Sequence, residues 1–366
     1  MAFAQVAGVK RIINFVDELG AINYGIWNAA IATADDLQRD FGIQSQLWFP
    51  TSDSNQFFEE LKSVKLVELD ATDRKKFLQV VSTLDKNTDI IVSHGCWRWP
   101  TIWGNWFKQA GFKWIYVPHG MLEPWSMQQK AWKKWPYFWF VEKPFALKSD
   151  LVRAVGAPEA KNLEQHFPRV KLIPNGVSTV FEIPAKAESP IIFLFMARLH
   201  FKKGPLNLAK AWVKSRLFNQ PGFQLLIAGP DEGELQGILT ETEKCNNAKY
   251  VGPVYGEEKM QLLKSAHFYV LPSLSEGFPT SVVEAMMFGL VPIVSQGINF
   301  PEVFEQQLGY DSDTSVESIQ AAIELAVDNL DSRSKLQEKG HILVKSSYSL
   351  NALARLQAEV FSALMK

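Results

Sequence analysis

The sequence predicts an α/β protein made of two doubly wound domains, and three observations support this prediction. The chain has 366 residues, which is too long for one ordinary core and suits two domains of roughly 150 to 200 residues. Short apolar runs alternate with helical stretches, as in parallel sheets whose strands are buried on both faces. The alternation occurs twice, on either side of a turn-rich segment at residues 174–190. We expect the two domains to face each other across a cleft at the carboxyl ends of both sheets, where such folds bind ligands.

The first half contains seven predicted strands separated by helical stretches such as residues 25–42. The strands are KRIINFV (10–16), SQLWF (45–49), KLVEL (65–69), DIIVSHG (89–95), KWIYVPHG (113–120), DLVRAV (150–155) and RVKLIPNG (169–176). Each run has the length of a strand. We expect this N-terminal domain to span residues 1–176.

The second half repeats the pattern more clearly. The predicted strands are IIFLFMARL (191–199), FQLLIAG (223–229), FYVLPS (268–273) and LVPIVSQ (290–296), and the predicted helices are residues 204–218, 232–244, 257–267 and 281–289. We expect this C-terminal domain to span residues 177–348. The last segment, 349–366, reads as an amphipathic helix that follows an unstructured bridge and packs back on the N-terminal domain.

Composition excludes several functional classes. A net charge of −1 argues against a nucleic-acid partner, which normally requires a basic excess. Cys96 and Cys245 form no Cys-x-x-Cys or Cys/His cluster, so we expect neither a disulfide framework nor a zinc site. The sequence shows no leader pattern and no apolar run of about 18 residues, so we expect a cytoplasmic protein. No predicted strand is followed by G-x-G-x-x-G, which argues against a nicotinamide-dependent dehydrogenase.

Two cations follow the predicted strand at 191–199. Arg198 and Lys203 lie at its carboxyl end, just before a helix that Gly204 and Pro205 open. Two positive side chains beside a helix N-terminus suit a phosphate group. The alternative is an ordinary solvated basic loop.

Two glutamates stand eight residues apart in SEGFPTSVVEAMMFG (275–289). Glu276 lies in the loop that leaves the strand at 268–273, where its carboxylate can accept hydrogen bonds from sugar hydroxyls. The neighbouring Gly277 lets the backbone approach a ligand closely. Glu284 has two interpretations, because Ser281-x-x-Glu284 is also a capping-box pattern.

This stretch resembles the E-x7-E motif of retaining glycosyltransferases of the GT-B fold, specifically glycosyltransferase family 4 (group 1). Other pieces resemble the family in the same order: PHGMLEPW (118–125), IPNGV (173–177), ARLHFKKG (197–204), LLIAGP (225–230) and VGPVYGEEKMQLLKSAHFYVLPS (251–273). The resemblance covers roughly residues 90 to 300. It implies two facing Rossmann-like domains, the first binding an acceptor and the second a nucleotide sugar.

The resemblance also implies roles for single residues. Arg198 and Lys203 would hold the diphosphate of a donor, Glu276 its sugar and Glu284 its ribose. The implied donor-binding residues are Arg198, Lys203, Gly229, Val254, Glu276, Gly277, Phe278, Pro279, Thr280 and Glu284. The implied catalytic residues are His119, Glu276, Arg198 and Lys203, and the implied acceptor-binding residues are Gly20, His94 and His119. Family members usually carry a Gly-Gly pair where this sequence has only Gly20. For His94, the alternative interpretation is a purely structural role.

The implied reaction moves a hexosyl group from a nucleoside diphosphate sugar to a hydroxyl of a glycan or lipid-linked acceptor, with retention, in surface polysaccharide synthesis. Arg198, Lys203 and the helix N-terminus near Thr280 would stabilise the leaving diphosphate, so we expect no metal and no further cofactor. The alternatives are a GT-B nucleotide-sugar epimerase or phosphorylase, and a non-catalytic scaffold that binds nucleotide sugars.

Tryptophan is concentrated in one region, since nine of the twelve lie between Trp97 and Trp139. The stretch from Trp125 to Lys148 mixes indoles with lysines, a combination typical of a membrane headgroup layer. One hypothesis is peripheral contact with the inner face of the plasma membrane. The alternative is that these aromatic side chains pack between the domains or line an acceptor groove. We expect Pro136 to interrupt any continuous helix here.

Overall fold

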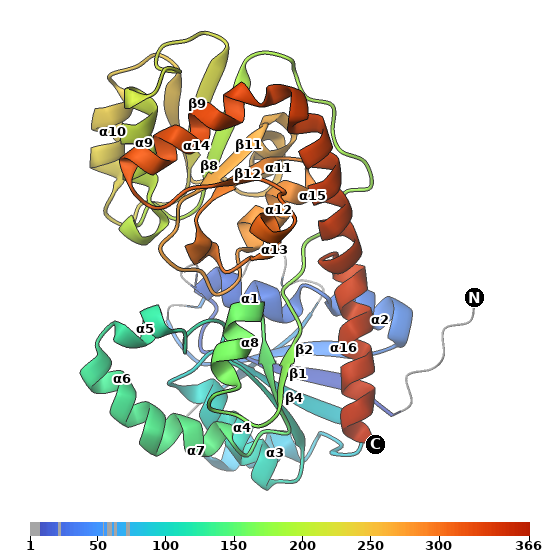
Figure 1. Cartoon of the computed structure of the whole chain (residues 1–366). Helices are drawn as coiled ribbons and strands as arrows, with labels where there is room; N and C mark the ends of the chain where they lie inside the picture. Colours follow the sequence, from blue (N-terminus) through green and yellow to red (C-terminus); the bar gives the residue numbers. More distant parts are fainter. Residues whose placement is uncertain (1–7, 21–22, 54, 57–60, 62–63, 71–73) are drawn as a thin grey trace. The chain divides into compact units, whose positions relative to one another are not determined.

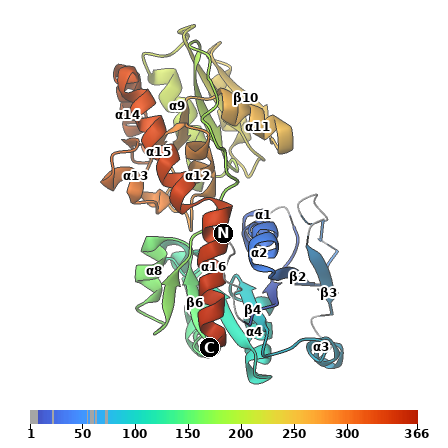
Figure 2. The ribbon, with the colours of Figure 1, turned by 90° about the vertical axis from the view of Figure 1, so that its right-hand side faces the viewer.

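The structure is a computed structural model that describes residues 8–20, 23–53, 55–56, 61, 64–70 and 74–366 (Figure 1). Contacts divide the chain into two compact units. Unit 1 comprises residues 1–176 with 350–366, and unit 2 comprises residues 177–349. Each unit contains one parallel sheet with its helices, as the sequence predicts (Figure 2).

Unit 1 contains a seven-stranded parallel sheet in the order β3-β2-β1-β4-β5-β6-β7. The strands are β1 (Arg11–Phe15), β2 (Gln44–Pro50), β3 (Lys65–Leu69), β4 (Asp89–His94), β5 (Lys113–Val117), β6 (Leu151–Ala154) and β7 (Val170–Leu172). All seven fall on predicted strands. Every residue of β4 is buried, as expected for a central strand covered on both faces.

The helices of unit 1 follow the strands in the order that a doubly wound sheet requires. They are α1 (Tyr24–Ile31), α2 (Ala34–Phe41), α3 (Arg74–Val81), α4 (Trp99–Gln109), α5 (Pro124–Gln128), α6 (Ala131–Tyr137), the π-helical turn η3 (Phe138–Glu142), α7 (Lys143–Ala146), α8 (Ala157–Leu163) and α16 (Leu350–Met365). Residues 25–42 form two helices, α1 and α2, because the chain leaves helical geometry at Thr33. The expected break at Pro136 is wrong, because α6 continues through the proline into η3 and α7.

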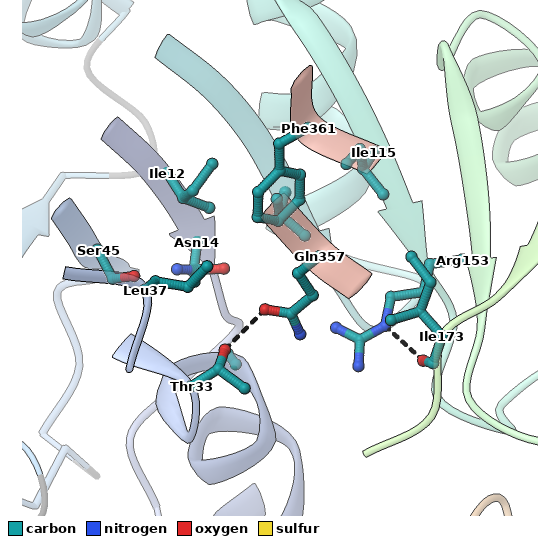
Figure 3. A pocket seen from close by; sticks show the side chains of 12 residues that line it. Ile12, Asn14, Thr33, Leu37, Ser45, Ile115, Arg153, Ile173, Gln357 and Phe361 are labelled. Atoms are coloured by element: carbon teal, nitrogen blue, oxygen red, sulfur yellow. Dashed lines mark hydrogen bonds between the residues drawn. The ribbon is translucent and has the colours of Figure 1, made fainter. Parts of the chain in front are cut away.

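The C-terminal helix α16 packs on the sheet and on α2 within unit 1. Gln357 accepts a hydrogen bond of 2.7 Å from Thr33, and Asn351 donates one of 2.8 Å to Asp40. Figure 3 shows Gln357 and Phe361 facing side chains of the sheet across a small cavity. Its volume is about 20 Å³, the room that one water molecule needs, so this is a packing interface and not a ligand site.

Unit 2 contains a six-stranded parallel sheet in the order β10-β9-β8-β11-β12-β13. The strands are β8 (Ile191–Met196), β9 (Phe223–Ala228), β10 (Ala248–Gly252), β11 (Phe268–Leu271), β12 (Val291–Val294) and β13 (Tyr310–Asp311). The sequence does not predict β10 and β13. Both are edge strands with partly exposed residues, so neither has the apolar run that marks the four inner strands.

The helices of unit 2 include three α-helices that the sequence analysis did not assign, α13, α14 and α15. The helices are η4 (Phe201–Lys203), α9 (Pro205–Lys214), α10 (Leu235–Thr242), α11 (Gly256–Ser265), α12 (Thr280–Met287), η5 (Gln296–Ile298), α13 (Glu302–Glu305), α14 (Val316–Asp328), η6 (Leu330–Ser332) and α15 (Arg333–Ser347). The expected unstructured bridge is wrong, because α15 occupies it. Its surface is mostly polar, and it packs on α12 through Gly340 and His341, whose Nδ1 lies 2.8 Å from the carbonyl oxygen of Met287. Within the described residues, no helix is long and apolar enough to cross a bilayer.

Candidate active site

The sheet of unit 2 reverses its strand order between β8 and β11. In a doubly wound sheet, ligands bind at such a switch point, beyond the carboxyl ends of the strands. The loop after β8 carries Arg198 and Lys203, and the loop after β11 carries Glu276. Because β10, β9, β8 and β11 are successive neighbours, the loops with Gly229 and Val254 lie along the same edge. The predicted donor residues therefore share one edge of this sheet.

Lys203 and Glu276 form an ion pair at this switch point. The side chains are 15% and 10% exposed, so the pair is largely removed from water. Ser273 Oγ donates a hydrogen bond of 2.6 Å to Glu276 Oε1, and Asn299 Nδ2 donates to the backbone carbonyl of Glu276. A buried carboxylate needs this kind of support, because a buried charge without partners is strongly destabilising. The arrangement places a cation and a multiply held carboxylate in direct contact.

The other two charged donor residues are also paired. Arg198 Nη1 contacts Glu232 at 2.6 Å, and Glu284 contacts Lys259 at 2.7 Å. Burial and the nearby carboxylates of Glu284 and Glu276 raise the pKa of the Tyr269 phenol. Tyr269 thus lies within electrostatic range of both glutamates of the motif, and its hydroxyl donates to the carbonyl of Met196 at 2.7 Å.

The capping interpretation of Glu284 is wrong. Helix α12 begins at Thr280 with Pro279 at the N-cap, so Ser281 lies inside the first turn. Among the described residues, no side-chain hydrogen bond caps this helix. Glu284 instead uses its carboxylate in the pair with Lys259, where it is 22% exposed. It therefore remains accessible to a ligand.

The remaining predicted donor residues are held by backbone geometry. Gly229 has a φ of +144°, and a Cβ there would meet the carbonyl oxygen of Ala197 at 1.8 Å, so only glycine fits. The half-buried Phe278 ring packs on Phe300 and Tyr348. Gly277 lies in the loop before α12, and Val254 lies in the loop between β10 and α11.

Asp311 and Asp313 form an Asp-x-Asp sequence, a pattern that can hold a divalent cation. Both side chains are engaged elsewhere. Asp311 accepts from Gln296 Nε2 at 2.8 Å, and Asp313 accepts from the backbone N–H of Ser315 at the start of α14. The part of the chain that the structure describes contains no group of three or more His, Cys, Asp or Glu side chains able to hold a metal ion.

Unit 1 reverses its strand order between β1 and β4, and a pocket of 300 Å³ lies at this second switch point. Residues following β1 and β4 line it: Val16, Asp17, Glu18, Asn23, Ile26, His94, Gly95, Cys96, Trp97 and Arg98, with Met121. Arg98 contacts Asp17 at 3.0 Å. Carboxylates, a guanidinium and an indole together suit a polar ligand with one apolar face, such as a sugar.

The two predicted histidines meet beside this pocket. His94 Nδ1 lies 2.8 Å from His119 Nε2, and His94 Nε2 lies 3.0 Å from Asn14 Oδ1. Asn14 Nδ2 donates to the carbonyl of Gln46, which fixes the amide with its oxygen toward His94. An amide oxygen only accepts, so His94 Nε2 carries the proton and His94 Nδ1 accepts from His119. His119 is therefore left with an unprotonated Nδ1, which accepts no hydrogen bond from a described residue.

Both histidines are held in the neutral form. Burial, and then the proximity of His119 and Arg153, lowers the pKa of His94 well below its usual range. Burial and the charge of Arg153 lower the pKa of His119 to about 3. Arg153 is itself buried and donates to the carbonyls of Ile173 and Pro174 at 2.8 Å (Figure 3 shows the first of these bonds). Because both rings stay neutral, the direction of the hydrogen bonds from His119 to His94 and from His94 to Asn14 is unchanged over the physiological pH range.

Gly20 lies beyond β1, and its carbonyl already accepts from Trp27 Nε1 at 3.2 Å and from the backbone N–H of Asn23 at 3.1 Å. Sequence reasoning missed Asn14, Glu232 and Lys259. Asn14 offered one signal, because it is a polar residue within the apolar strand RIINF, where a buried amide needs a partner. Nothing in the sequence marks Glu232 or Lys259 as partners of Arg198 and Glu284.

Comparison with known proteins gives the same architecture. A solved structure of HepE from Anabaena in complex with UDP and glucose superposes with a TM-score of 0.75, covering 97% of this chain and 100% of that one at 14% identity. The family model "Glycosyl transferases group 1" matches residues 178–342, and "Glycosyltransferase Family 4" matches residues 31–181. This chain is a group 1 glycosyltransferase of the GT-B fold.

Relatives of this glycosyltransferase include proteins named for lipid-linked acceptors. The gpi3 subunit of phosphatidylinositol N-acetylglucosaminyltransferase from Schizosaccharomyces pombe is 27% identical over 205 residues, which is 54% of this chain and 44% of that protein. GDP-mannose:cellobiosyl-diphosphopolyprenol alpha-mannosyltransferase from Xanthomonas oryzae is 30% identical over 132 residues, 35% of this chain and 34% of that protein. The matches thus span less than half the length of each of these two relatives.

Proposed function

We propose that this glycosyltransferase moves a hexosyl group from a nucleoside diphosphate sugar to a hydroxyl of a glycan or lipid-linked acceptor, with retention and without a metal. The Lys203–Glu276 contact carries the proposal, because it joins a phosphate-binding cation to a hydroxyl-binding carboxylate at the switch point of unit 2. The Anabaena structure with UDP and glucose supports this donor class. A role in surface polysaccharide synthesis is part of this proposal; one relative, the amylovoran biosynthesis glycosyltransferase AmsK of Erwinia amylovora, is 30% identical over 129 residues, which is 32% of this chain and 31% of that protein.

The chemistry follows from charge. The bond between the anomeric carbon and the diphosphate oxygen breaks, and the acceptor oxygen bonds to that carbon on the same face. The leaving phosphate oxygen takes the acceptor's proton, so no separate nucleophile or base is required. Negative charge grows on the diphosphate, where Lys203 and Arg198 stabilise it; preorganised groups of this kind are each worth about 3 kcal/mol. Glu276 holds the sugar hydroxyls, and Glu284 the ribose.

His119 acts as a hydrogen-bond acceptor in this proposal. The hydrogen bonds from Asn14 through His94 leave His119 Nδ1 unprotonated, so this nitrogen can accept a hydrogen bond from a substrate hydroxyl. Asn14 and His94 are positioning residues that fix this tautomer without touching the donor. The pocket of 300 Å³ in unit 1 would take the acceptor, with the Trp97 indole against its apolar face.

A two-step experiment tests the proposal. Thermal unfolding is measured with a panel of nucleoside diphosphates and their sugars; a ligand at 100 times its Kd stabilises by about 2.7 kcal/mol. The best donor is then incubated with the protein, and release of nucleoside diphosphate is followed with wild type, Lys203→Ala and the control Lys214→Ala. Lys214 also pairs with a glutamate in unit 2, but on the exposed end of α9.

The outcomes separate the alternatives. Release of diphosphate by wild type and Lys214→Ala, but not by Lys203→Ala, supports transfer chemistry. An isomerised sugar without any release identifies an epimerase, and release driven by inorganic phosphate identifies a phosphorylase. Stabilisation by a nucleotide sugar that is never consumed, whatever acceptor glycan is added, identifies a binding scaffold.

A further inference from the structure

The helical run from α6 through η3 to α7 carries a row of exposed aromatic side chains. Trp132, Trp135, Trp139 and Phe140 are 73%, 40%, 49% and 82% exposed, and we call these four residues the aromatic face. Elsewhere in the described part of unit 1, the exposed large apolar side chains are aliphatic. Large aromatic side chains normally bury most of their surface, so four exposed ones on one run call for a partner.

The opposite side of the same run is buried. Phe138, Glu142 and Ala146 recur every four residues and are 1% exposed or less. Trp132, Trp135 and Trp139 recur at intervals of three and four, which places them on one side of a helix. Figure 1 shows α6 and α7 running along the margin of unit 1, away from its strands. The run is therefore a two-sided helix with one side fixed to the unit and the aromatic face turned to solvent.

Glu142 connects this helical run to the core of unit 1 through hydrogen bonds. Its carboxylate accepts hydrogen bonds from the Trp97 backbone N–H at 3.1 Å, Thr101 Oγ1 at 2.7 Å and the Tyr116 hydroxyl at 2.7 Å. A fully buried carboxylate with three donors holds the helix in one position. The aromatic face is thus presented on a rigid support, which lowers the entropic cost of docking.

The exposed charge of the segment that carries the aromatic face is positive. Glu142 is the single acidic residue between residues 124 and 148, and it is buried. The lysines of this segment are Lys130, Lys133, Lys134, Lys143 and Lys148. Lys133 Nζ lies 4.7 Å from the Trp132 ring centroid, and Lys143 Nζ lies 4.2 Å from that of Trp139. Cations and indoles therefore form one mixed surface in a chain whose net charge is −1.

We propose that the aromatic face docks on the headgroup layer of an anionic lipid bilayer. Indole rings favour the boundary between headgroups and acyl chains, and lysines near the surface attract anionic lipids. The helical run is too short to span a bilayer, but an amphipathic helix of this kind lies in the plane of the interface. A protein partner would also cover aromatic rings, but five lysines without one exposed carboxylate favour a surface that is negative throughout.

Vesicle sedimentation with the full chain tests the proposal. Vesicles of phosphatidylcholine alone are compared with vesicles that also contain phosphatidylglycerol, at low and at high salt. We expect binding to the anionic vesicles only, weakened by salt because surface charges are screened. Equal binding to both vesicle types, or to neither, would overturn the proposal. No donor or acceptor is present, so the result is independent of the proposed function.

Matched variants locate the surface. Trp132→Ala with Trp139→Ala and Phe140→Ala should lower the vesicle partition coefficient by more than about tenfold, from lost apolar contact. The control changes three similarly exposed side chains of unit 2, Phe181, Leu325 and Ile342, to alanine, and it should bind like wild type. All of these side chains are exposed, so unchanged thermal unfolding verifies the fold of each variant. Wild-type binding by the first variant would overturn the proposal, and would assign any membrane contact to another surface.

Charge is tested separately. Lys133→Glu with Lys148→Glu should lower the partition coefficient at least about tenfold, because each lysine near an anionic surface is worth about fivefold. The control makes the same change at Lys161 and Lys171, which are exposed on α8 and β7 of the same unit. Equal losses in both pairs would show that overall charge, and not this face, governs binding, which would contradict the proposal.

Discussion

The two switch points of this glycosyltransferase have the same topology and opposite chemistry. In unit 2, the groups at the edge are ionised and paired: Lys203 with Glu276, and Arg198 with Glu232. In unit 1, the central groups are neutral, and His94, His119 and Asn14 form a chain of hydrogen bonds. Sheets of the same topology can therefore present either charged pairs or neutral hydrogen-bonding groups at the switch point, depending on which side chains follow the strands.

The difference matches two tasks in catalysis. A diphosphate that gains charge in the transition state is stabilised by cations, whereas a neutral hydroxyl is oriented by a group with a fixed donor or acceptor. If this division is correct, substitutions in unit 2 should cost more activity than substitutions in unit 1. The following predictions test that order.

The largest effect is expected at Lys203. Lys203→Ala should lower kcat by at least about 10²-fold, from lost stabilisation of the leaving diphosphate. Steady-state release of nucleoside diphosphate measures this, with Lys214→Ala as the matched loss of a lysine–glutamate pair. Near-wild-type turnover in Lys203→Ala would show that Lys203 does not stabilise the leaving diphosphate.

Glu276→Ala should lower turnover by about 10²-fold while free nucleoside diphosphate still binds, because Glu276 serves the sugar. Glu284→Ala should do the reverse and weaken nucleotide binding through the ribose. Calorimetry with the free diphosphate, beside turnover with the donor, separates the two. Loss of nucleotide binding in Glu276→Ala would show that this division of labour is wrong.

A smaller effect is expected in unit 1. Asn14→Asp places a carboxylate against His94 and raises the pKa of that histidine, so that protonated His94 donates to His119 and reverses its tautomer. We expect kcat/KM to fall about tenfold, the value of one hydrogen bond of about 1.4 kcal/mol, and to fall further as pH is lowered. Asn162→Asp is the control, since Asn162 Nδ2 also bonds a backbone carbonyl but lies on α8. A pH profile identical to wild type would contradict the proposed role of the Asn14–His94–His119 hydrogen bonds.

The last prediction concerns stability as a function of pH. The pKa of His119 is about 3 in the folded protein and about 6.5 when unfolded, so between these values the unfolded chain binds the extra proton. Stability due to this group is therefore present above about pH 6.5 and is lost as pH falls. The slope is about 1.4 kcal/mol per pH unit for each such histidine.

Glu159 opposes this trend, because burial raises its pKa to about 7 and favours folding as pH falls from there. The difference between wild type and His119→Gln isolates the histidine. Denaturant unfolding between pH 6 and pH 4 should show a shallower loss in His119→Gln. Parallel curves of unfolding free energy against pH for the two proteins would show that the pKa of His119 is the same in the folded and the unfolded chain.

The core strands and the charged motifs were predictable from the sequence because both are local signals. Buried strands such as β4 are continuous apolar runs, and Arg198, Lys203, Glu276 and Glu284 occur at fixed spacings. The edge strands β10 and β13 of unit 2 and the helices α13, α14 and α15 were missed. The two strands and α15 carry weak apolar patterns because much of their surface is exposed, whereas α14 has a buried apolar face that the sequence analysis overlooked. Glu284 had two local interpretations, and only the start of α12 at Thr280 decides between them.

The hydrogen-bonded group of unit 1 could not be predicted from the sequence, because it depends on which strands are neighbours in the sheet. Asn14, His94 and His119 lie on or after β1, β4 and β5, and they meet only because these strands are neighbours in the sheet. Nothing about a single histidine in sequence reveals its partner 25 residues away. The positions of the histidines at strand ends were visible, but their tautomers depend on an amide 80 residues from His94.

The Lys203–Glu276 pair also bears on how a catalytic cycle would end. While a donor is bound, its sugar hydroxyls can satisfy Glu276 and leave Lys203 to the diphosphate. After transfer the sugar is gone and Glu276 keeps only the hydrogen bond from Ser273, and the loss of the cationic partner of a buried carboxylate costs about 3–5 kcal/mol. Under the proposed function, Glu276 would then compete with the spent nucleotide for Lys203, and re-forming the pair would expel that nucleotide. The resting ion pair would thereby protect the enzyme from inhibition by its own product.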